Sequence, residues 1–208
     1  MSRRAQNLWL AAGLAATLLM TGACARSQQT RYYVLSPLAE GANQAARVEQ
    51  AGPRLFVDSV VLPAYLVRPE IVTRLSSEEV KPLEFRRWAE PLEAGLTRVL
   101  AENLSALLPV WRVETEPTAN HRPGDFMVSV RVTRLDADAK AVNVAAEWSV
   151  RDRTKQETVF ASRVAIAEAV TGAEPDQIVA ALNRAVYSLS KQIADSLKPI
   201  GGEHGKAP

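Results

Sequence analysis

Residues 89–108, AEPLEAGLTRVLAENLSALL, decide the fold class. Their apolar side chains recur in steps of three, four and one, which places them in a single stripe on an α-helix. The stripe consists of Leu92, Leu96, Val99, Leu100, Leu104, Leu107 and Leu108. Pro91 suits the first turn of this helix, and Pro109 suits its end. Residues 89–108 therefore predict an amphipathic helix with one buried face.

A second stripe of this kind runs from Pro175 to Leu197 and predicts a second amphipathic helix. Pro175 suits the first helical position, and Glu174 and Asp176 favour the positive end of the helix dipole. The sequence Pro199-Ile200-Gly201-Gly202 is expected to end the helix, and residues 199–208 are expected to form a disordered tail.

Outside the two helices, the hydrophobic pattern is that of β-strands. It is clearest in residues 126–133, where Phe126, Val128, Val130 and Val132 alternate with more polar residues. Further strands are predicted at 30–36, 54–62, 111–113, 142–151 and 158–170, with a hairpin of 71–75 and 80–85 and a loop at 38–52. Helices with one apolar face must cover a sheet. We predict a single α/β domain over residues 30–198, with a mixed, largely antiparallel sheet of five or more strands covered by two long amphipathic helices.

The N-terminal segment predicts export. Arg3 and Arg4 precede sixteen apolar or small residues, 8–23, which span about 24 Å as a helix and so fall short of a ~30 Å hydrocarbon core. This pattern favours a secretory signal over a transmembrane helix. Residues 20–24, MTGAC, resemble a bacterial lipobox in which Cys24 is lipidated and becomes the mature N-terminus, although Thr21 stands where leucine is commonest. The alternative is an ordinary signal that happens to end near a free cysteine.

Lipidation of Cys24 would make residues 1–23 a lipoprotein signal peptide and residues 24–29 a tether. Bacterial lipoproteins carry three acyl chains, and stable anchoring needs at least two. Ala25 follows the cysteine, whereas the known inner-membrane retention signal is aspartate at that place. The resemblance therefore implies an outer-membrane anchor facing the periplasm, with inner-membrane retention left open.

The charge balance argues against nucleic-acid binding. The chain has 25 basic and 23 acidic residues, and the signal segment holds two of the arginines and no acid. Residues 24–208 therefore have no formal net charge, so they lack the overall positive charge that nucleic-acid-binding domains use.

No arrangement typical of an enzyme occurs. His121 and Asp125 lie four residues apart, but Pro123 and Gly124 favour a solvated turn between them. The acid pairs Glu78/Glu79, Glu114/Glu116 and Asp136/Asp138 lie in or beside predicted turns, where acids are solvated. With His204 in the tail and a single cysteine, no zinc cluster is available. We therefore expect a binding or assembly protein without catalytic residues, metal or cofactor.

Three motifs resemble the PqiC-like family of auxiliary lipoproteins, which serve MCE-type ABC and related lipid transporters. The first is the YYxL strand at Tyr32, Tyr33 and Leu35. The second is the segment PxYLxRPxIVxR at 63–74, in which Val67 replaces a frequent aspartate. The third is RWAxPL at 87–92. The resemblance covers nearly all of the mature chain, and the order and spacing of these motifs are unusual.

The resemblance implies an α/β fold and a periplasm-facing lipoprotein of a double-membraned bacterium. Its partners would be an MCE-domain protein and inner-membrane transporter components, and its role would be a docking subunit at the outer-membrane end of a lipid transport system. A homo-oligomeric ring belongs to the same expectation. The alternative is a periplasmic lipid-binding carrier or a chaperone-like lipoprotein, although a carrier needs an apolar cavity that buries most of an acyl chain.

Six residues are candidates for a partner or oligomer interface: Tyr65, Leu66, Arg68, Arg74, Arg87 and Trp88. If their segment is extended, Arg68 and Arg74 project from one face and are placed to pair with acids of a neighbouring subunit. The alternative is pairing within the chain, which would order the turn. Trp88 fits a core or staple position better than an interface anchor. Tyr65 and Leu66 would either form an exposed tip or pack against the first helix.

Overall fold

The computed structural model describes residues 28–39, 52–115, 125–172 and 174–204, with side chains through Ile200. The elements in chain order are β1 (Arg31–Tyr33), β2 (Arg54–Val57), the 3-10 turn η2 (Ala64–Leu66), β3 (Glu70–Arg74), β4 (Val80–Trp88), α2 (Leu92–Leu107), β5 (Arg112–Glu114), β6 (Asp125–Ala137), β7 (Ala141–Asp152), β8 (Glu157–Ala169) and α3 (Pro175–His204). The prediction of an α/β domain with two amphipathic helices is confirmed.

The strands form two sheets rather than the single sheet that the pattern suggested. One sheet has the order β1-β4-β3, and the other has the order β5-β2-β6-β7-β8. The β3–β4 hairpin and the meander of β6, β7 and β8 are antiparallel, as predicted. However, β1 pairs with β4 in parallel, and β2 pairs in parallel with both β5 and β6. The sheets are therefore mixed rather than largely antiparallel, because short strands far apart in the chain add in parallel.

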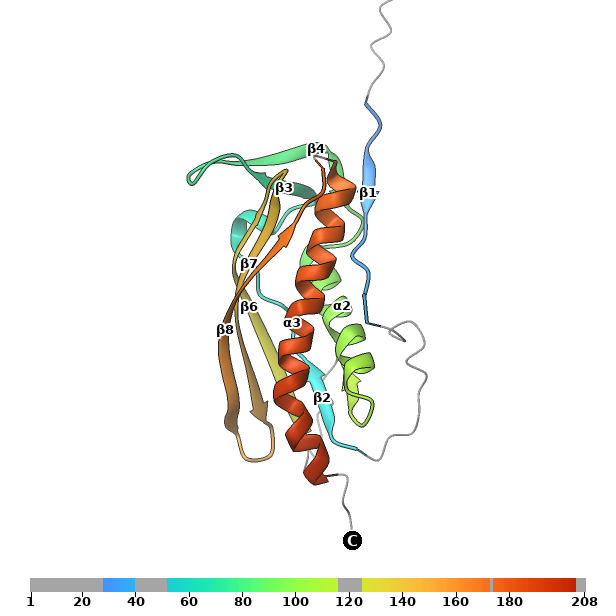
Figure 1. Cartoon of the computed structure of the whole chain (residues 1–208), viewed down its shortest axis with the longest axis vertical. Helices are drawn as coiled ribbons and strands as arrows, with labels where there is room; N and C mark the ends of the chain where they lie inside the picture. The colour runs from blue at the N-terminus through green and yellow to red at the C-terminus, as the bar shows by residue number, and fades with distance from the viewer. Residues whose placement is uncertain (1–27, 40–51, 116–124, 173, 205–208) are drawn as a thin grey trace, which may run out of the picture.

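Both helices cover the same face of the five-stranded sheet (Figure 1). Alternate residues of β7 point into the layer between sheet and helices, and all five are buried: Val142, Val144, Ala146, Trp148 and Val150. The residues between them lie on the opposite, more exposed face, as expected for a strand covered on one side. The hydrophobic core is therefore a single layer between the sheet and the pair α2 and α3.

Helix α2 confirms the first predicted stripe. It begins at Leu92, directly after Pro91, whose missing backbone N–H is no loss at that position. Its buried residues are Leu92, Gly95, Leu96, Val99, Leu100, Ala101, Asn103 and Leu104. Asn103 is the polar exception in this stripe, and it is fully buried.

Helix α3 confirms the second stripe but is longer than predicted. It continues through Pro199 to His204, whereas the sequence suggested a stop at Pro199. A proline inside a helix removes one backbone hydrogen bond. Leu197 is fully buried and Ile200 packs against the core, so apolar contacts on both sides of Pro199 offset this loss. Residues 205–208 of the predicted tail lie outside the described residues.

Polar side chains of both helices hold the segment that follows β1. The Oδ1 atom of Asn103 accepts hydrogen bonds from the backbone N–H groups of Leu38 and Ala39, at 3.0 and 3.1 Å. Asn183 on α3 accepts one from Ser36 at 3.1 Å. Arg98 donates to the carbonyl of Leu35 at 2.9 Å. These bonds replace the strand pairing that residues 34–36 were predicted to have, since β1 ends at Tyr33.

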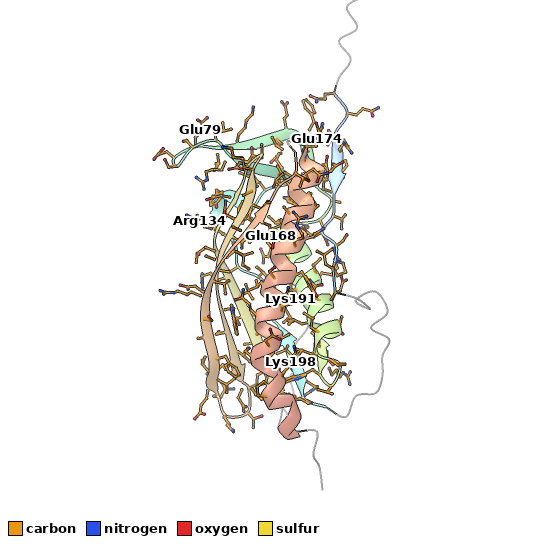
Figure 2. The ribbon with its side chains drawn as sticks, viewed as in Figure 1. Glu79, Arg134, Glu168, Glu174, Lys191 and Lys198 are labelled. Carbon is orange, nitrogen blue, oxygen red and sulfur yellow. The ribbon has the colours of Figure 1, made fainter. Side chains whose placement is uncertain are left out.

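The β3–β4 hairpin and the start of α3 lie at the same end of the molecule. Figure 2 shows Glu79 in the hairpin turn and Glu174 before α3 at one end, with Lys198 toward the other. The first residue of β1, Arg31, pairs with Asp176 of α3 at 3.3 Å, so β1 begins at that end too. The predicted signal, Cys24 and most of the predicted loop at 38–52 lie outside the described residues.

Candidate docking groove

The segment that carries PxYLxRPxIVxR is a tight turn rather than an extended strand. Residues Ala64–Leu66 form η2, in which the N–H of Leu66 donates to the carbonyl of Pro63 at 3.0 Å. The N–H of Val67 donates to the carbonyl of Ala64 at 3.2 Å. Only after Pro69 does the chain become extended, as β3. The segment from Arg68 to Arg74 is therefore not extended throughout, so the predicted arrangement of these two arginines on one face of a strand does not apply.

Tyr65 anchors η2 to the five-stranded sheet. Its half-buried side chain reaches Leu135 of β6, where the hydroxyl donates to the carbonyl at 3.2 Å and accepts from the N–H at 3.3 Å. The guanidinium of Arg74 lies 5.9 Å from the centroid of the Tyr65 ring, within cation–π range. Tyr65 therefore has a structural role that its place in a proline-bounded segment did not reveal.

Arg74 is paired inside the chain. Its Nη2 lies 2.6 Å from Oδ1 of Asp136 on β6, and its Nε donates to the same oxygen at 2.7 Å. Its Nη1 donates to the carbonyl of Ser77 in the hairpin turn at 3.2 Å. The hydrogen bond that Arg74 donates to Asp136 raises the pKa of Arg74 further above its usual value. Arg74 thus joins the two sheets and stabilises the hairpin.

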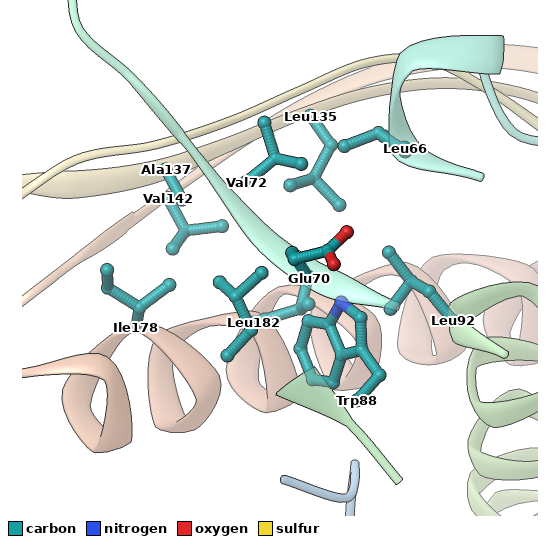
Figure 3. Close-up of a pocket in the computed structure, with 11 residues that line it drawn as sticks. Leu66, Glu70, Val72, Trp88, Leu92, Leu135, Ala137, Val142, Ile178 and Leu182 are labelled. Carbon is teal, nitrogen blue, oxygen red and sulfur yellow. The ribbon is translucent and has the colours of Figure 1, made fainter. Parts of the chain in front are cut away.

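Leu66 and Trp88 belong to the core. They are 3% and 8% exposed, and the backbone N–H of Trp88 donates to the carbonyl of Pro69 at 2.7 Å. Figure 3 shows the indole of Trp88 beside Leu182 of α3 and Glu70 of β3, around a void of about 10 Å³. Arg87, the neighbour of Trp88, lies 3.5 Å from a carboxylate oxygen of Glu70. These contacts give the three residues structural roles.

The turn and the start of α2 enclose an open groove of about 360 Å³ on the surface. Most of its lining is apolar, from Leu62, Leu66, Val67, Pro69, Trp88, Ala89, Pro91 and Leu92. Arg68, Glu90 and Glu93 supply its charged groups. Val67 is 63% exposed, which is high for a large apolar side chain. The groove therefore joins two of the sequence motifs, 63–74 and 87–92.

The charges that line the groove differ in how they are neutralised. The Oε1 atom of Glu90 lies 2.7 Å from Nη2 of Arg98, which also binds Glu102. Arg68 and Glu93 are exposed, and neither side chain hydrogen-bonds or forms an ion pair with any residue that the structure describes. Among the described residues, the groove thus carries one cation and one carboxylate whose side chains have no charged partner.

The acidic residues considered as catalytic or metal-binding groups have structural roles. Asp125 is 1% exposed and forms an ion pair with Arg54, so it is not available to orient a catalytic base. Asp136 binds Arg74 and Arg134, and Glu114 binds Arg112. His121 lies outside the described residues. Within the described ranges, no group of three or more histidine, cysteine and acidic residues is placed to hold a metal ion.

Sequence reasoning identified Arg68 but missed Val67 and Glu93. Glu93 falls outside the apolar stripe of its helix and is exposed, but nothing in the sequence shows that η2 lies beside that helix. The replacement of a frequent aspartate by Val67 in the PxYLxRP motif was the one available signal, because it puts an apolar residue next to a charged one.

The fold and this groove define a class of protein: an α/β domain that presents an apolar surface groove. The described helices include none that is long and apolar enough to cross a membrane. A family model described as an ABC-type transport auxiliary lipoprotein component matches residues 33–194. The chain belongs to this family, as its motifs predicted.

Individual relatives agree with the family match. Over 135 residues the chain is 29% identical to the Intermembrane transport lipoprotein PqiC of Escherichia coli strain K12. The matched region covers 64% of this chain and 69% of that protein. A protein of the same name from Shigella flexneri matches equally well.

Two crystal structures show the same fold. An uncharacterized protein has a TM-score of 0.69 at 22% identity, covering 82% of this chain and 99% of that one. A protein from Xanthomonas campestris has a TM-score of 0.60 at 15% identity, covering 83% and 97%.

Proposed function

We propose that this protein is a non-catalytic docking subunit of an MCE-type intermembrane lipid transport system, supporting membrane integrity. It would be anchored in the outer membrane and would bind an MCE-domain protein together with inner-membrane transporter components. The family match and the likeness to a protein named for intermembrane transport support this role. The observation that carries it is the apolar groove lined by residues of two family motifs, together with Arg68, whose side chain pairs with no described residue.

The interior supports docking over the carrier alternative. Behind the groove, the layer between sheet and helices holds voids of about 10 and 20 Å³. Pockets that enclose small molecules measure ~300–1,000 Å³. Neither void is large enough to enclose an acyl chain, whereas an open surface groove suits a protein segment.

The proposal is tested by purifying the full-length protein from membranes with its native partners and identifying them by mass spectrometry. We expect an MCE-domain protein, with recovery lowered by Arg68→Ala and unchanged by Arg163→Ala, an arginine on β8 whose side chain is 85% exposed and does not line the groove. Trp88 is unsuitable as a test position, because removing a buried tryptophan side chain costs about 3–5 kcal/mol and would unfold part of the domain. Recovery of stoichiometric phospholipid without any protein partner would overturn the docking role in favour of a carrier.

The membrane anchor is part of the same proposal. We expect the protein to incorporate labelled palmitate, and we expect Cys24→Ser to abolish labelling. Separation of the two membranes by density should place the wild-type protein with the outer membrane. The family resemblance also predicts a homo-oligomeric ring, and mass photometry of the detergent-solubilised protein tests this prediction.

A further inference from the structure

The free charges of the groove lie on different walls. Arg68 follows η2 on one wall, and Glu93 lies in the first turn of α2 on the other. No ion pair joins them, although both line the same groove. An acid in the first turn stabilises a helix through its dipole, which accounts for a carboxylate at this position. It does not account for the free cation opposite or for the apolar lining between the two.

We propose that this groove docks an amphipathic segment of a partner protein that carries a carboxylate for Arg68 and a cationic side chain for Glu93. An apolar side chain of the segment would lie between them, against Val67 and Ala89. This inference rests on the proposed docking function and names the chemistry of the partner at that site. Two opposite charges contributed by different elements would also fix the direction in which the segment lies.

Physical arguments favour a protein segment over a lipid. The groove is open to the surface, which suits an amphipathic helix or an extended peptide laid into it. An acyl chain spans about half of a ~30 Å hydrocarbon core and would have to continue into the interior. The interior behind Leu66 and Trp88 is packed, so the chain could not extend there.

The charges are expected to act mainly by excluding wrong partners and wrong orientations. Charges at the rim of an interface contribute little when they remain solvated, but like charges brought together there are strongly unfavourable. Reversing the sign of Arg68 or Glu93 is therefore a sharper test than removing the charge. We expect each reversal to lower binding at least tenfold.

A photo-crosslinking amino acid placed at residue 67 or 89 of the full-length protein in native membranes tests this directly. We expect both positions to crosslink to one partner, through a peptide in which an apolar residue is flanked by an acid and a base. Arg68→Glu and Glu93→Lys should each reduce this crosslink at least tenfold. The same charge changes elsewhere, Lys191→Glu on α3 and Glu157→Lys on β8, should leave it unchanged.

The outcomes separate this inference from the docking function. A partner that copurifies but crosslinks only to a probe placed at residue 157 or 191, and not from residue 67 or 89, would overturn the groove assignment and leave the docking function standing. Crosslinks from residue 67 to a second copy of this chain would make the groove a contact between copies, which also contradicts the inference. A lipid adduct at residue 67 with no partner recovered would overturn both.

Discussion

The guanidinium of Arg74 lies 2.6 Å from the carboxylate of Asp136, and this contact joins the three-stranded sheet to β6 of the five-stranded sheet. Both side chains are about one-fifth exposed, so the pair is shielded from most solvent. Arg68, six residues earlier in the same motif, has no partner among the described residues. One motif therefore contains an arginine that stabilises the fold and another that remains free to bind.

Arg74→Ala is expected to lower the free energy of unfolding by about 1–3 kcal/mol, because it leaves a half-buried carboxylate without its main partner. Urea unfolding of the purified protein measures this. Arg134→Ala is the matched control, since Arg134 binds the same carboxylate but is 62% exposed. An equal loss in the two variants would contradict the structural role of Arg74.

Arg68→Ala is expected to change the free energy of unfolding by less than about 0.5 kcal/mol, as for surface positions without partners. The same urea experiment measures it. A loss as large as that of Arg74→Ala would show that Arg68 supports the fold, and partner loss in that variant would then carry no information about docking.

Asp125→Asn is expected to destabilise the protein by about 3–5 kcal/mol, because the change removes the carboxylate charge that Arg54 pairs with in a buried site. Asp125 and Arg54 are 1% and 14% exposed. Thermal and urea unfolding measure the loss. Asp195→Asn, which breaks an exposed pair with Lys198, should have little effect on stability. If Asp195→Asn lowered stability as much as Asp125→Asn, burial would not be the cause of the destabilisation.

Asn103→Ala is expected to release the segment that follows β1. The variant leaves two backbone N–H groups, those of Leu38 and Ala39, without their acceptor. Each buried unpaired donor costs about 1–3 kcal/mol. Hydrogen exchange should show faster exchange of these two amides, whereas Ser105→Ala on the same helix should leave them protected. Unchanged protection in Asn103→Ala would refute this account of the segment.

Acid should loosen the β6–β7 turn at Asp138. The backbone N–H groups of Ala141 and Lys140 donate to its carboxylate at 2.9 and 2.7 Å and lower its pKa. A carboxyl group whose pKa is lowered by folding contributes stability above its unfolded value of ~3.9, and this contribution is lost as the pH falls through the folded pKa. The amide resonances of Lys140 and Ala141 should therefore titrate with a midpoint below ~3.9.

Asp138→Asn is the control for that titration. With no ionisable group at residue 138, the amides of Lys140 and Ala141 should lose this transition. A midpoint at or above ~3.9 in the wild-type protein would contradict the stabilising role of these hydrogen bonds.

The predicted helices and strands were confirmed where the hydrophobic pattern was local and repeated along the chain. The stripe of Leu92, Leu96 and Leu100 located α2, and alternation in residues 126–133 located β6. Parallel pairing of β2 with β5 and β6 left no such signal, because partners in a parallel pair lie far apart in the chain. The end of α3 was missed because the preference of Pro199 for ending a helix is weaker than the contacts of Leu197 and Ile200.

In the candidate groove, too, the sequence revealed some features and only the structure revealed the others. The sequence alone identified one group of interface candidates, because their motifs could be compared with a known family. The group includes Arg68, Arg74, Tyr65 and Trp88. The sequence could not separate their roles. Asp136, the partner of Arg74, lies 62 residues away in sequence, and only the packing of β3 against β6 brings the two together.

Sequence alone therefore determined the fold class and the family, because hydrophobic period and motif order are properties of neighbouring residues. Tertiary structure decided which charges are neutralised and which stay free. That difference depends on distances of a few ångströms between segments far apart in the chain, and burial sets how strongly each pair interacts. Arg74 meets a carboxylate in such a place, whereas Arg68 lines an open apolar groove and meets no carboxylate among the described residues.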